Sequence, residues 1–554
     1  MNNSKSYLAF IFSVITLIGC DGTNNKEPAV INSLDITTEL TEQTQVLQAT
    51  INCTDCQANL DEYSWSIDGE VVSNTNSYIL EESDYNKEVR IDVSANNNAN
   101  LPDTRYQIII PSSRIQVAEI YSAHEAFAAL KTDGTVITWG NNDSGGDSRA
   151  VELTSVDKIF STATSFAALK TDGTVVTWGD SDNGGDSSAV ELTNIDKIYS
   201  TQTAFAALKT DGTVITWGES DSGGDSSTVE LNDIVNIYSN WYAFAALTID
   251  GTVVAWGDSD NGGDSSVLEL TGVDKIYSTA FAALKTDGTV VTWGNSGNGG
   301  NGGASDDVDL SNVTEIFSTQ HAFAALKTDG SVVTWGNLHA GGDSSAVELT
   351  NVESIYSTST AFAALKTDGT VVTWGESPNG GDSSAVELSD VVDVFSTWFA
   401  FSALKNDGSV VTWGSNIYGE DVSTVELTNV AEIYTTAFEF AALKTDGSVV
   451  TWGDEPSPFE LTNVTDIHSN ISSFSALKND ATVVSWALGE IIDTSAELTN
   501  IAEIFSTWYA FSALKSDRTL VSWGSSSSGG DSSAVENDLQ PRLGDIAVIE
   551  TDIP

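Results

Sequence analysis

The sequence predicts an all-β protein in which a small β-sandwich precedes a long array of hairpin repeats. Residues 204–218 carry the main evidence, because two strand-forming runs meet there at Asp211-Gly212. An Asp-Gly pair accepts the positive φ angles of a two-residue hairpin turn. The stretch recurs eleven times, and the copies end at Trp139, Trp178, Trp217, Trp256, Trp293, Trp335, Trp374, Trp413, Trp452, Trp486 and Trp523.

The composition excludes some partners. The chain has 554 residues, and 22 Lys and Arg against 79 Asp and Glu give a formal charge of −57. Such a charge repels nucleic acid and anionic lipid head groups. The excess of acid is interpreted as a solvated surface, with recruitment of cations or basic partners as the alternative.

Residues 1–20 have the pattern of a secretory signal. Lys5 precedes an apolar run over residues 7–18, which is too short to span a bilayer. The Leu-Ile-Gly-Cys at residues 17–20 resembles the bacterial lipobox, and this resemblance implies lipidation of Cys20. Residues 21–29 are then a tether, and the protein is expected at the cell envelope, on the inner or the outer membrane.

Residues 30–112 contain no copy of the hairpin. Strands are expected at Ser33–Leu40, Gln45–Ile51, Tyr63–Ile67, Val89–Ala95 and Tyr106–Ile110, separated by turn-forming residues. This pattern predicts a small antiparallel sandwich. The run Tyr-Ser-Trp-Ser-Ile-Asp-Gly at residues 63–69 resembles bacterial immunoglobulin-like or PKD-like modules, which implies that Trp65 lies in the core between two sheets.

Cys53 and Cys56 have the spacing of a redox pair or half a zinc site. No His precedes His124, so the ligands of a complete zinc site are missing from this region. In an exported protein, a local disulfide is the preferred interpretation, with thioredoxin-like chemistry as the alternative.

The array is assigned to residues 113–536. Successive repeat Trp residues are 39, 39, 39, 37, 42, 39, 39, 39, 34 and 37 residues apart, and a nearly fixed period indicates one structural unit per copy. In one unit, strands are expected at Lys197–Ser200, Phe205–Lys209 and Thr213–Trp217, with a weaker fourth at Ser227–Leu231. The repeat Trp residues are interpreted as core between units, and exposed sugar stacking is the alternative.

The order of short strand, Ala-Leu, Asp-Gly, hydrophobic strand and Trp-Gly resembles the RCC1 repeat, and residues 413–420 match its motif best. The resemblance implies propeller blades that serve as an interaction platform. The chain departs from the family pattern in having shorter repeats, and Ala204 stands where the family has His. A closed ring, a seven-bladed propeller with four extra units and an open stack are all compatible with eleven copies.

The last copies are atypical. Asp480-Ala481 and Asp517-Arg518 replace Asp-Gly, which places a side chain where the turn requires positive φ. Residues 537–554 form a tail, and residues 544–549 have the pattern of a further strand that closes the ring.

The Gly-rich loop after Trp-Gly has features of a calcium site, because carboxylates alternate around glycines. The candidate ligands are Asp180, Asp182, Asp186, Asp258, Asp260 and Asp264. A structural turn is the preferred interpretation, so no cofactor is expected and calcium is the one candidate.

No residue is identified as catalytic. None of His124, His321, His339 and His468 lies in a motif with a nucleophile and an orienting acid. The sequence therefore favours a non-enzymatic, membrane-anchored protein that binds an unknown protein or glycan. An envelope lyase or hydrolase with a site on the loops, and a passive adhesion or spacer element, are the alternatives.

Overall fold

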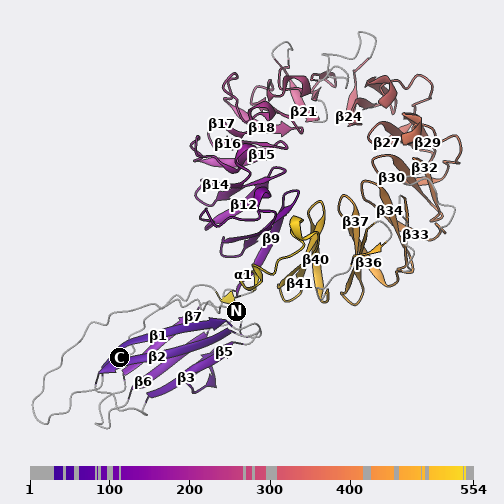
Figure 1. Cartoon of the computed structure of the whole chain (residues 1–554). Coiled ribbons are helices and arrows are strands. Elements are labelled where there is room, and N and C mark those ends of the chain that lie inside the picture. Colours follow the sequence, from indigo (N-terminus) through magenta and orange to yellow (C-terminus); the bar gives the residue numbers. More distant parts are fainter. Residues whose placement is uncertain are drawn as a thin grey trace, which may run out of the picture. The chain divides into compact units, whose positions relative to one another are not determined.

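The computed structural model describes residues 30–40, 45–54, 61–80, 84, 89–95, 104–110, 114–265, 270–277, 281–294, 309–415, 426–453, 461–487, 490–492, 498–540 and 542–543. The chain forms two compact units, Met1–Val117 with Gln540–Pro554, and Ala118–Leu539. The predicted fold class, an all-β chain with an array of eleven propeller-like repeats, is confirmed (Figure 1). Within the described part, no helix is long and apolar enough to cross a membrane.

The first unit contains two larger antiparallel sheets and a short two-stranded one, β8 (Arg114–Ile115) with β43 (Arg542–Leu543). The strands of the two larger sheets are β1 (Val30–Leu40), β2 (Gln45–Thr54) and β5 (Ser77–Leu80) in one sheet, and β4 (Glu70–Ser73), β3 (Asp61–Ile67), β6 (Val89–Ala95) and β7 (Thr104–Ile110) in the other. Trp65 on β3 is fully buried and stacks on Tyr78 of β5, with ring centroids 6.2 Å apart. Trp65 therefore joins the two sheets, while an immunoglobulin-like identity stays a prediction. The strands β4 and β5, each only four residues long, were not predicted.

The second unit is a ring of eleven antiparallel sheets, ten of three strands and one of four, which are the blades (Figure 1). Blades 1 to 11, in chain order, are β9–β11 (Val117–Ser122, Ala126–Lys131, Val136–Gly140), β12–β14 (Val156–Ser161, Ser165–Lys170, Val175–Gly179), β15–β17 (Ile195–Ser200, Ala204–Lys209, Val214–Gly218), β18–β20 (Ile234–Ser239, Ala243–Thr248, Val253–Gly257), β21–β23 (Val273–Tyr277, Ala282–Lys285, Val290–Thr292), β24–β26 (Val313–Ser318, Ala322–Lys327, Val332–Gly336), β27–β29 (Val352–Ser357, Ala361–Lys366, Val371–Gly375), β30–β32 (Val391–Ser396, Ala400–Lys405, Val410–Gly414), β33–β35 (Val430–Thr435, Glu439–Lys444, Val449–Gly453), β36–β38 (Val464–Ser469, Ser473–Lys478, Val483–Ala487) and β40–β42 (Ile501–Ser506, Ala510–Lys515, Leu520–Gly524).

The predicted fourth strand at Ser227–Leu231 is wrong. This segment folds back on itself, because the Val229 N–H donates to the Ser226 carbonyl (3.1 Å) and the Ser227 N–H donates to the Asp225 carboxylate (2.9 Å). Its main chain therefore makes local turns instead of a ladder. Among the described residues, β39 (Glu490–Ile491) in blade 10 is the one strand that extends a blade to four.

The hairpin between the second and third strands has a three-residue loop, which differs from the predicted two-residue turn. The Gly212 N–H donates to the Lys209 carbonyl (3.0 Å), and Gly212, unlike Asp211, has a positive φ of 83°. Asp211 instead accepts hydrogen bonds from the N–H (3.0 Å) and hydroxyl (2.7 Å) of Thr213. This geometry is a type I turn followed by a left-handed residue, and it explains both halves of the Asp-Gly pair.

The two atypical hairpins adopt the same loop with a side chain in the left-handed region. Ala481 has a φ of 60° and Arg518 a φ of 69°. A left-handed residue other than Gly costs about 1 kcal/mol. We expect Arg518→Gly to stabilise the ring by about that amount in chemical denaturation. Lys515→Gly is the control. It removes a cation next to the same hairpin but leaves Arg518 in the left-handed conformation, so it should not stabilise the ring.

Neighbouring blades share one apolar core per interface. Between blades 3 and 4, Ala206 and Leu208 pack against Ile237 and Phe244, and Phe244 stacks on Trp256 at 5.1 Å. The Trp256 indole N–H donates to the Gly223 carbonyl of blade 3 (3.0 Å). The repeat Trp residues are therefore buried links between blades, as predicted.

The ring is closed, which resolves the three alternatives left by the sequence. The Trp139 indole N–H of blade 1 donates to the Gly529 carbonyl of blade 11 (3.1 Å), just as Trp178 and Trp217 donate to Gly145 and Gly184 of their preceding blades (3.0 Å each). The Trp508 N–H of blade 11 also donates to the His124 carbonyl of blade 1 (3.0 Å). The predicted closing strand at residues 544–549 lies outside the described residues. Blades 11 and 1 bond each other directly, and the described residues of the tail add to this: Lys131 Nζ of blade 1 donates to the Asp538 carbonyl (2.7 Å), and β43 (Arg542–Leu543) pairs with β8 (Arg114–Ile115).

Candidate functional site

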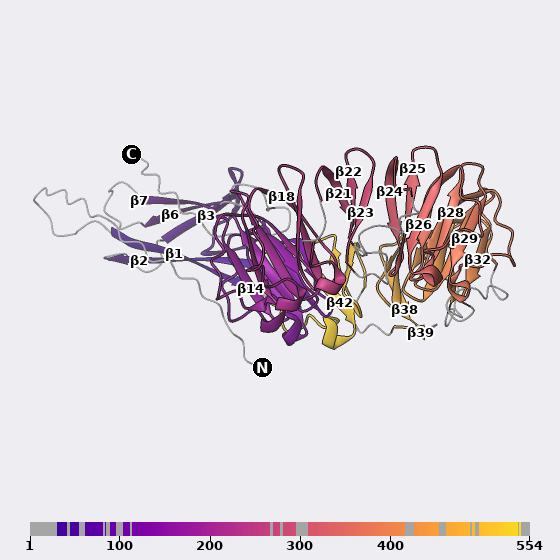
Figure 2. The ribbon, with the colours of Figure 1, turned by 90° about the horizontal axis from the view of Figure 1, so that it is seen from above.

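The two sides of the ring differ in kind. In each blade the first strand ends, the second begins and the third ends on the same side, because the strands are antiparallel. This side, the turn face, carries the first turns (201–203 in blade 3) and the loops after Trp-Gly. Those loops contain single-turn helices, at Asn142–Ser144, Ser181–Gly185, Ser220–Ser222, Ser259–Asn261, Leu338–Ala340, Ser377–Asn379 and Ser526–Ser528. The opposite side, the hairpin face, carries the Asp-Gly hairpins (Figure 2).

Main-chain hydrogen bonds connect the first turns of successive blades. The bonded residue lies two positions before the second strand, and its N–H donates to the carbonyl of the equivalent residue in the next blade. The N–H···O pairs are His124 to Ala163 (3.0 Å), Ala163 to Gln202 (2.9 Å), Gln202 to Trp241 (3.1 Å), Gln320 to Ser359 (3.0 Å), Ser359 to Trp398 (2.9 Å), Trp398 to Ala437 (3.1 Å), Ala437 to Ile471 (3.1 Å) and Trp508 to His124 (3.0 Å). Among the described first turns, these bonds therefore tie neighbouring blades together at eight junctions of the turn face.

Three Trp residues occupy this bonded position and are exposed. Trp241, Trp398 and Trp508, the turn Trp residues, have exposed fractions of 61%, 43% and 39%, whereas the described repeat Trp residues are buried. Each is followed by an aromatic residue: Tyr242, Phe399 and Tyr509. The fold does not require them, because Ala163 and Ser359 make the same main-chain bond elsewhere. They are the strongest sign of binding on the ring.

Sequence reasoning missed the turn Trp residues, although a signal existed. The chain has 15 Trp, of which eleven end the repeats and Trp65 belongs to the first unit. The remaining three fall at one position of the repeat, where the main-chain bond does not require a Trp side chain. The loops after Trp-Gly, where function was expected, lie on the same face, but that expectation did not include these aromatic residues.

Two of the turn Trp residues contact aromatic rings of the next blade. Trp398 meets Phe438 edge-on, with centroids 5.5 Å apart. Trp508 stacks on His124 with centroids 3.5 Å apart, across the closure of the ring. Burial lowers the pKa of the His124 imidazole from its ordinary 6.5, although the nearby Glu125 carboxylate opposes this shift. His124 is therefore neutral at pH 7.

This stack makes part of the ring's stability depend on pH. Because the folded pKa of His124 is lowered, the unfolded chain binds the proton first as the pH falls below 6.5. We expect the unfolding free energy of the wild type to decline relative to His124→Phe as the pH falls from 7 to 5. Parallel pH profiles in chemical denaturation would contradict this, because Phe preserves the stack but does not titrate.

Charge is distributed unequally between the two faces. The ring unit contains fifteen Lys and Arg, and fourteen lie in first strands, at the ends of second strands or in a hairpin. The exception is Arg149, which pairs with Asp147 (2.5 Å). Each described loop after a Trp-Gly pair carries at least one carboxylate. The turn face is therefore acidic, and the hairpin face has mixed charge.

The calcium candidates lie on the turn face, where some carboxylates bond the main chain. Asp180 accepts from the Asp182 N–H (3.0 Å) and from the Asn183 amide (3.0 Å). Asp258 repeats both bonds with Asp260 (2.8 Å) and Asn261 (2.9 Å).

Two further candidates, Asp186 and Asp264, lie just after the loop helices. Asp186 accepts a hydrogen bond from the Ser188 N–H (2.8 Å), which lowers the pKa of its carboxyl. Asp264 is exposed at the equivalent position. In the described part, no three His, Cys, Asp or Glu side chains are grouped for a metal ion. Calcium binding stays a prediction.

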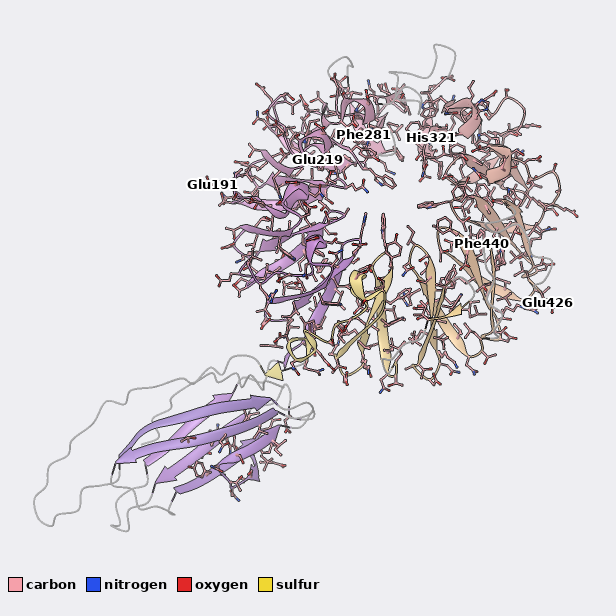
Figure 3. All side chains as sticks on the ribbon, viewed as in Figure 1. Glu191, Glu219, Phe281, His321, Glu426 and Phe440 are labelled. Carbon is pink, nitrogen blue, oxygen red and sulfur yellow. The ribbon has the colours of Figure 1, made fainter. Side chains whose placement is uncertain are left out.

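The other named residues are dispersed. His468 pairs with Asp466 (3.4 Å), His339 lies in a loop helix and His321 in the first turn of blade 6 (Figure 3). Cys20 and Cys56 lie outside the described residues, as does the side chain of Cys53 on β2. Lipidation and the disulfide therefore stay predictions.

No family model and no curated protein matches the chain. Three similar solved structures are the ectodomain of the receptor kinase CR4 from Physcomitrella patens (15% identity, 44% of this chain and 70% of that one, TM-score 0.27), the computationally designed Ika8 protein (13%, 60% and 96%, 0.26) and Prp20p, the RCC1 of Saccharomyces cerevisiae (14%, 68% and 83%, 0.26). No functional conclusion follows from likeness at this level.

Proposed function

We propose that this chain is a non-enzymatic binding protein that presents the turn face of its ring to a macromolecular partner, a protein or a glycan. The exposure of the turn Trp residues at one equivalent position carries this proposal. Exposed aromatic side chains on a rigid frame lose little conformational entropy on binding, and Trp and Tyr are enriched at binding hot spots.

The proposal places the protein at the bacterial cell envelope, anchored by lipid at Cys20. The signal-like residues 1–20 and the polar residues that follow them support this placement. The anchor is the one membrane contact proposed, and nucleic acid is not a partner because of the charge of −57. Metabolic labelling with palmitate tests the anchor: Cys20→Ala should abolish the label, and an equally labelled variant would contradict it.

A comparison of binding profiles tests the function. The full chain and a triple variant, Trp241→Gln, Trp398→Gln and Trp508→Gln, are applied to glycan and protein arrays. Ile249→Gln is the matched control, because Ile249 is 76% exposed but lies in a hairpin on the opposite face. We expect partners that bind the wild type and the control but not the triple variant. Absence of any partner, or equal binding by the triple variant, would contradict the proposal.

A further inference from the structure

We infer that the turn face recognises the Lys or Arg side chains of a basic segment in a protein partner. The inference rests on the proposed binding function and names its partner class. It is carried by a constellation that occurs three times: a main-chain hydrogen bond joins the turn of a turn Trp to a turn of an adjacent blade that holds or bonds a Glu.

The first constellation joins blades 4 and 3. The Trp241 carbonyl accepts from the Gln202 N–H (3.1 Å), and the hydroxyl of the next residue, Thr203, donates to Glu219 Oε2 (2.7 Å). Glu219 is exposed, and its own N–H donates to the Thr203 carbonyl (3.1 Å). An exposed indole and an exposed carboxylate are thus carried by adjoining turns.

The second constellation has the same arrangement of hydrogen bonds, between blades 8 and 7. The Trp398 carbonyl accepts from the Ser359 N–H (2.9 Å), and Thr360 donates to Glu376 Oε2 (2.8 Å). Glu follows the Trp-Gly pair in blades 3 and 7 alone, and each of those blades precedes one that carries a turn Trp. This pairing of Trp with Glu is unexpected if both were incidental surface residues.

The third constellation exists because the ring is closed. Trp508 of blade 11 stacks on His124 of blade 1 and bonds its carbonyl, and Glu125 is the next residue. The Asn141 amide fixes the Glu125 carboxylate (2.7 Å). His124 and Trp508, which are 384 positions apart in the chain, therefore belong to one patch.

The chemistry of this constellation fits a cation. Lys and Arg are attracted to the face of a Trp ring, and a neighbouring carboxylate adds a charged hydrogen bond. Of the fifteen Lys and Arg residues of the ring unit, Arg149 lies on the turn face, and it already pairs with Asp147. Neutral hydrogen-bonding groups that could orient a sugar are instead used within the turns, as Thr203 and Thr360 are. Charge complementarity therefore favours a basic polypeptide over a glycan.

Three such patches on one rigid ring would engage several basic residues of one segment. Each contact is weak at an exposed site, but contacts made by one chain reinforce each other. The binding should therefore depend strongly on salt and on all three turn Trp residues together.

Fluorescence anisotropy of a labelled peptide tests the inference on the full chain. The probe is a twelve-residue peptide of alternating Arg and Gly, and its neutral match has citrulline in place of Arg. We expect the Arg peptide to bind at least tenfold more tightly than the citrulline peptide, and to weaken at least tenfold between 50 and 500 mM NaCl. Trp241→Ala, Trp398→Ala and Trp508→Ala together should cost at least a further tenfold.

Matched Glu variants separate the constellation from the general charge. Glu219→Gln with Glu376→Gln should weaken Arg-peptide binding about fivefold. Glu191→Gln with Glu426→Gln removes the same charge at the outer edge of the ring and should change binding less than twofold (Figure 3). Circular dichroism confirms that each variant is folded. Equal effects of the two pairs, or equal binding of Arg and citrulline peptides, would overturn the inference.

Binding of a neutral oligosaccharide shows whether only the basic partner class is wrong or the proposed binding function is wrong as well. If a hexamer of N-acetylglucosamine binds through the turn Trp residues and the Arg peptide does not, the basic partner is wrong but the binding function stands. If no array partner and neither probe depends on the turn Trp residues, both proposals fail.

Discussion

Trp139→Ala is expected to destabilise the ring by about 4 kcal/mol, the loss typical of a large buried aromatic side chain replaced by Ala. Trp139 is 4% exposed, stacks on Phe127 at 5.2 Å and bonds the Gly529 carbonyl of the last blade. In a closed ring, its interface is equivalent to those inside the array. Urea denaturation followed by circular dichroism measures the change.

Trp256→Ala is the matched variant, because Trp256 makes the same contacts between two central blades. The closed ring predicts losses for the two variants that agree within about 1 kcal/mol, since like substitutions at equivalent sites have like costs. In an open stack, Trp139 would lie on an end unit and its loss would be nearly silent. A Trp139→Ala variant as stable as the wild type would therefore refute closure.

Gly223→Ala should cost about 3 kcal/mol, although it adds a single methyl group. The φ of Gly223 is 97°, which side chains rarely adopt, and an added Cβ would lie 2.6 Å from Cδ2 of the buried Phe244 ring. Strain at a left-handed position and overpacking each cost about 1–3 kcal/mol. The loop of one blade fits against the aromatic core of the next, so this substitution also displaces the acceptor of the Trp256 indole.

Gly272→Ala is the control for this prediction. Gly272 also has a positive φ, 67°, but an added Cβ would meet only the Thr286 hydroxyl at 3.7 Å. Equivalent positions of other blades hold residues such as Asn194 and Asp233 in the same conformation. We expect a loss of about 1 kcal/mol, from backbone strain alone. If Gly223→Ala were no worse than Gly272→Ala, the tight fit between blades would be wrong.

The sequence predicted the repeat well because its patterns are local. Alternating apolar residues, the Asp-Gly pair and the terminal Trp each report on contacts within a few residues or with the adjacent copy. The burial of Trp217 and the strain at Arg518 followed directly. The prediction of a fourth strand was wrong for a local reason as well, because Asp225 and Ser226 accept hydrogen bonds from N–H groups that a strand would need for its ladder.

Ring closure and the constellations could not be derived in the same way. Closure depends on a small angle between successive blades, added up over eleven copies, and no single repeat encodes it. Trp508 contacts His124 because the ring is closed, and no local sequence pattern around either residue predicts this contact. The sequence shows where Trp241 and Glu219 fall in their repeats. That their turns adjoin is known only from the structure, through the bond of Gln202 to the next blade.

Cross-linking across the closure tests the central claim most directly, because it probes both the ring and its third constellation. His124→Cys and Trp508→Cys replace two side chains that stack at 3.5 Å in blades 1 and 11. A short bis-maleimide should join these two residues within one chain, as mass spectrometry of the monomer would show. The pair Trp241→Cys and Trp508→Cys, in blades that do not adjoin, should remain unlinked. Failure of residues 124 and 508 to link within the monomer would contradict the closed ring.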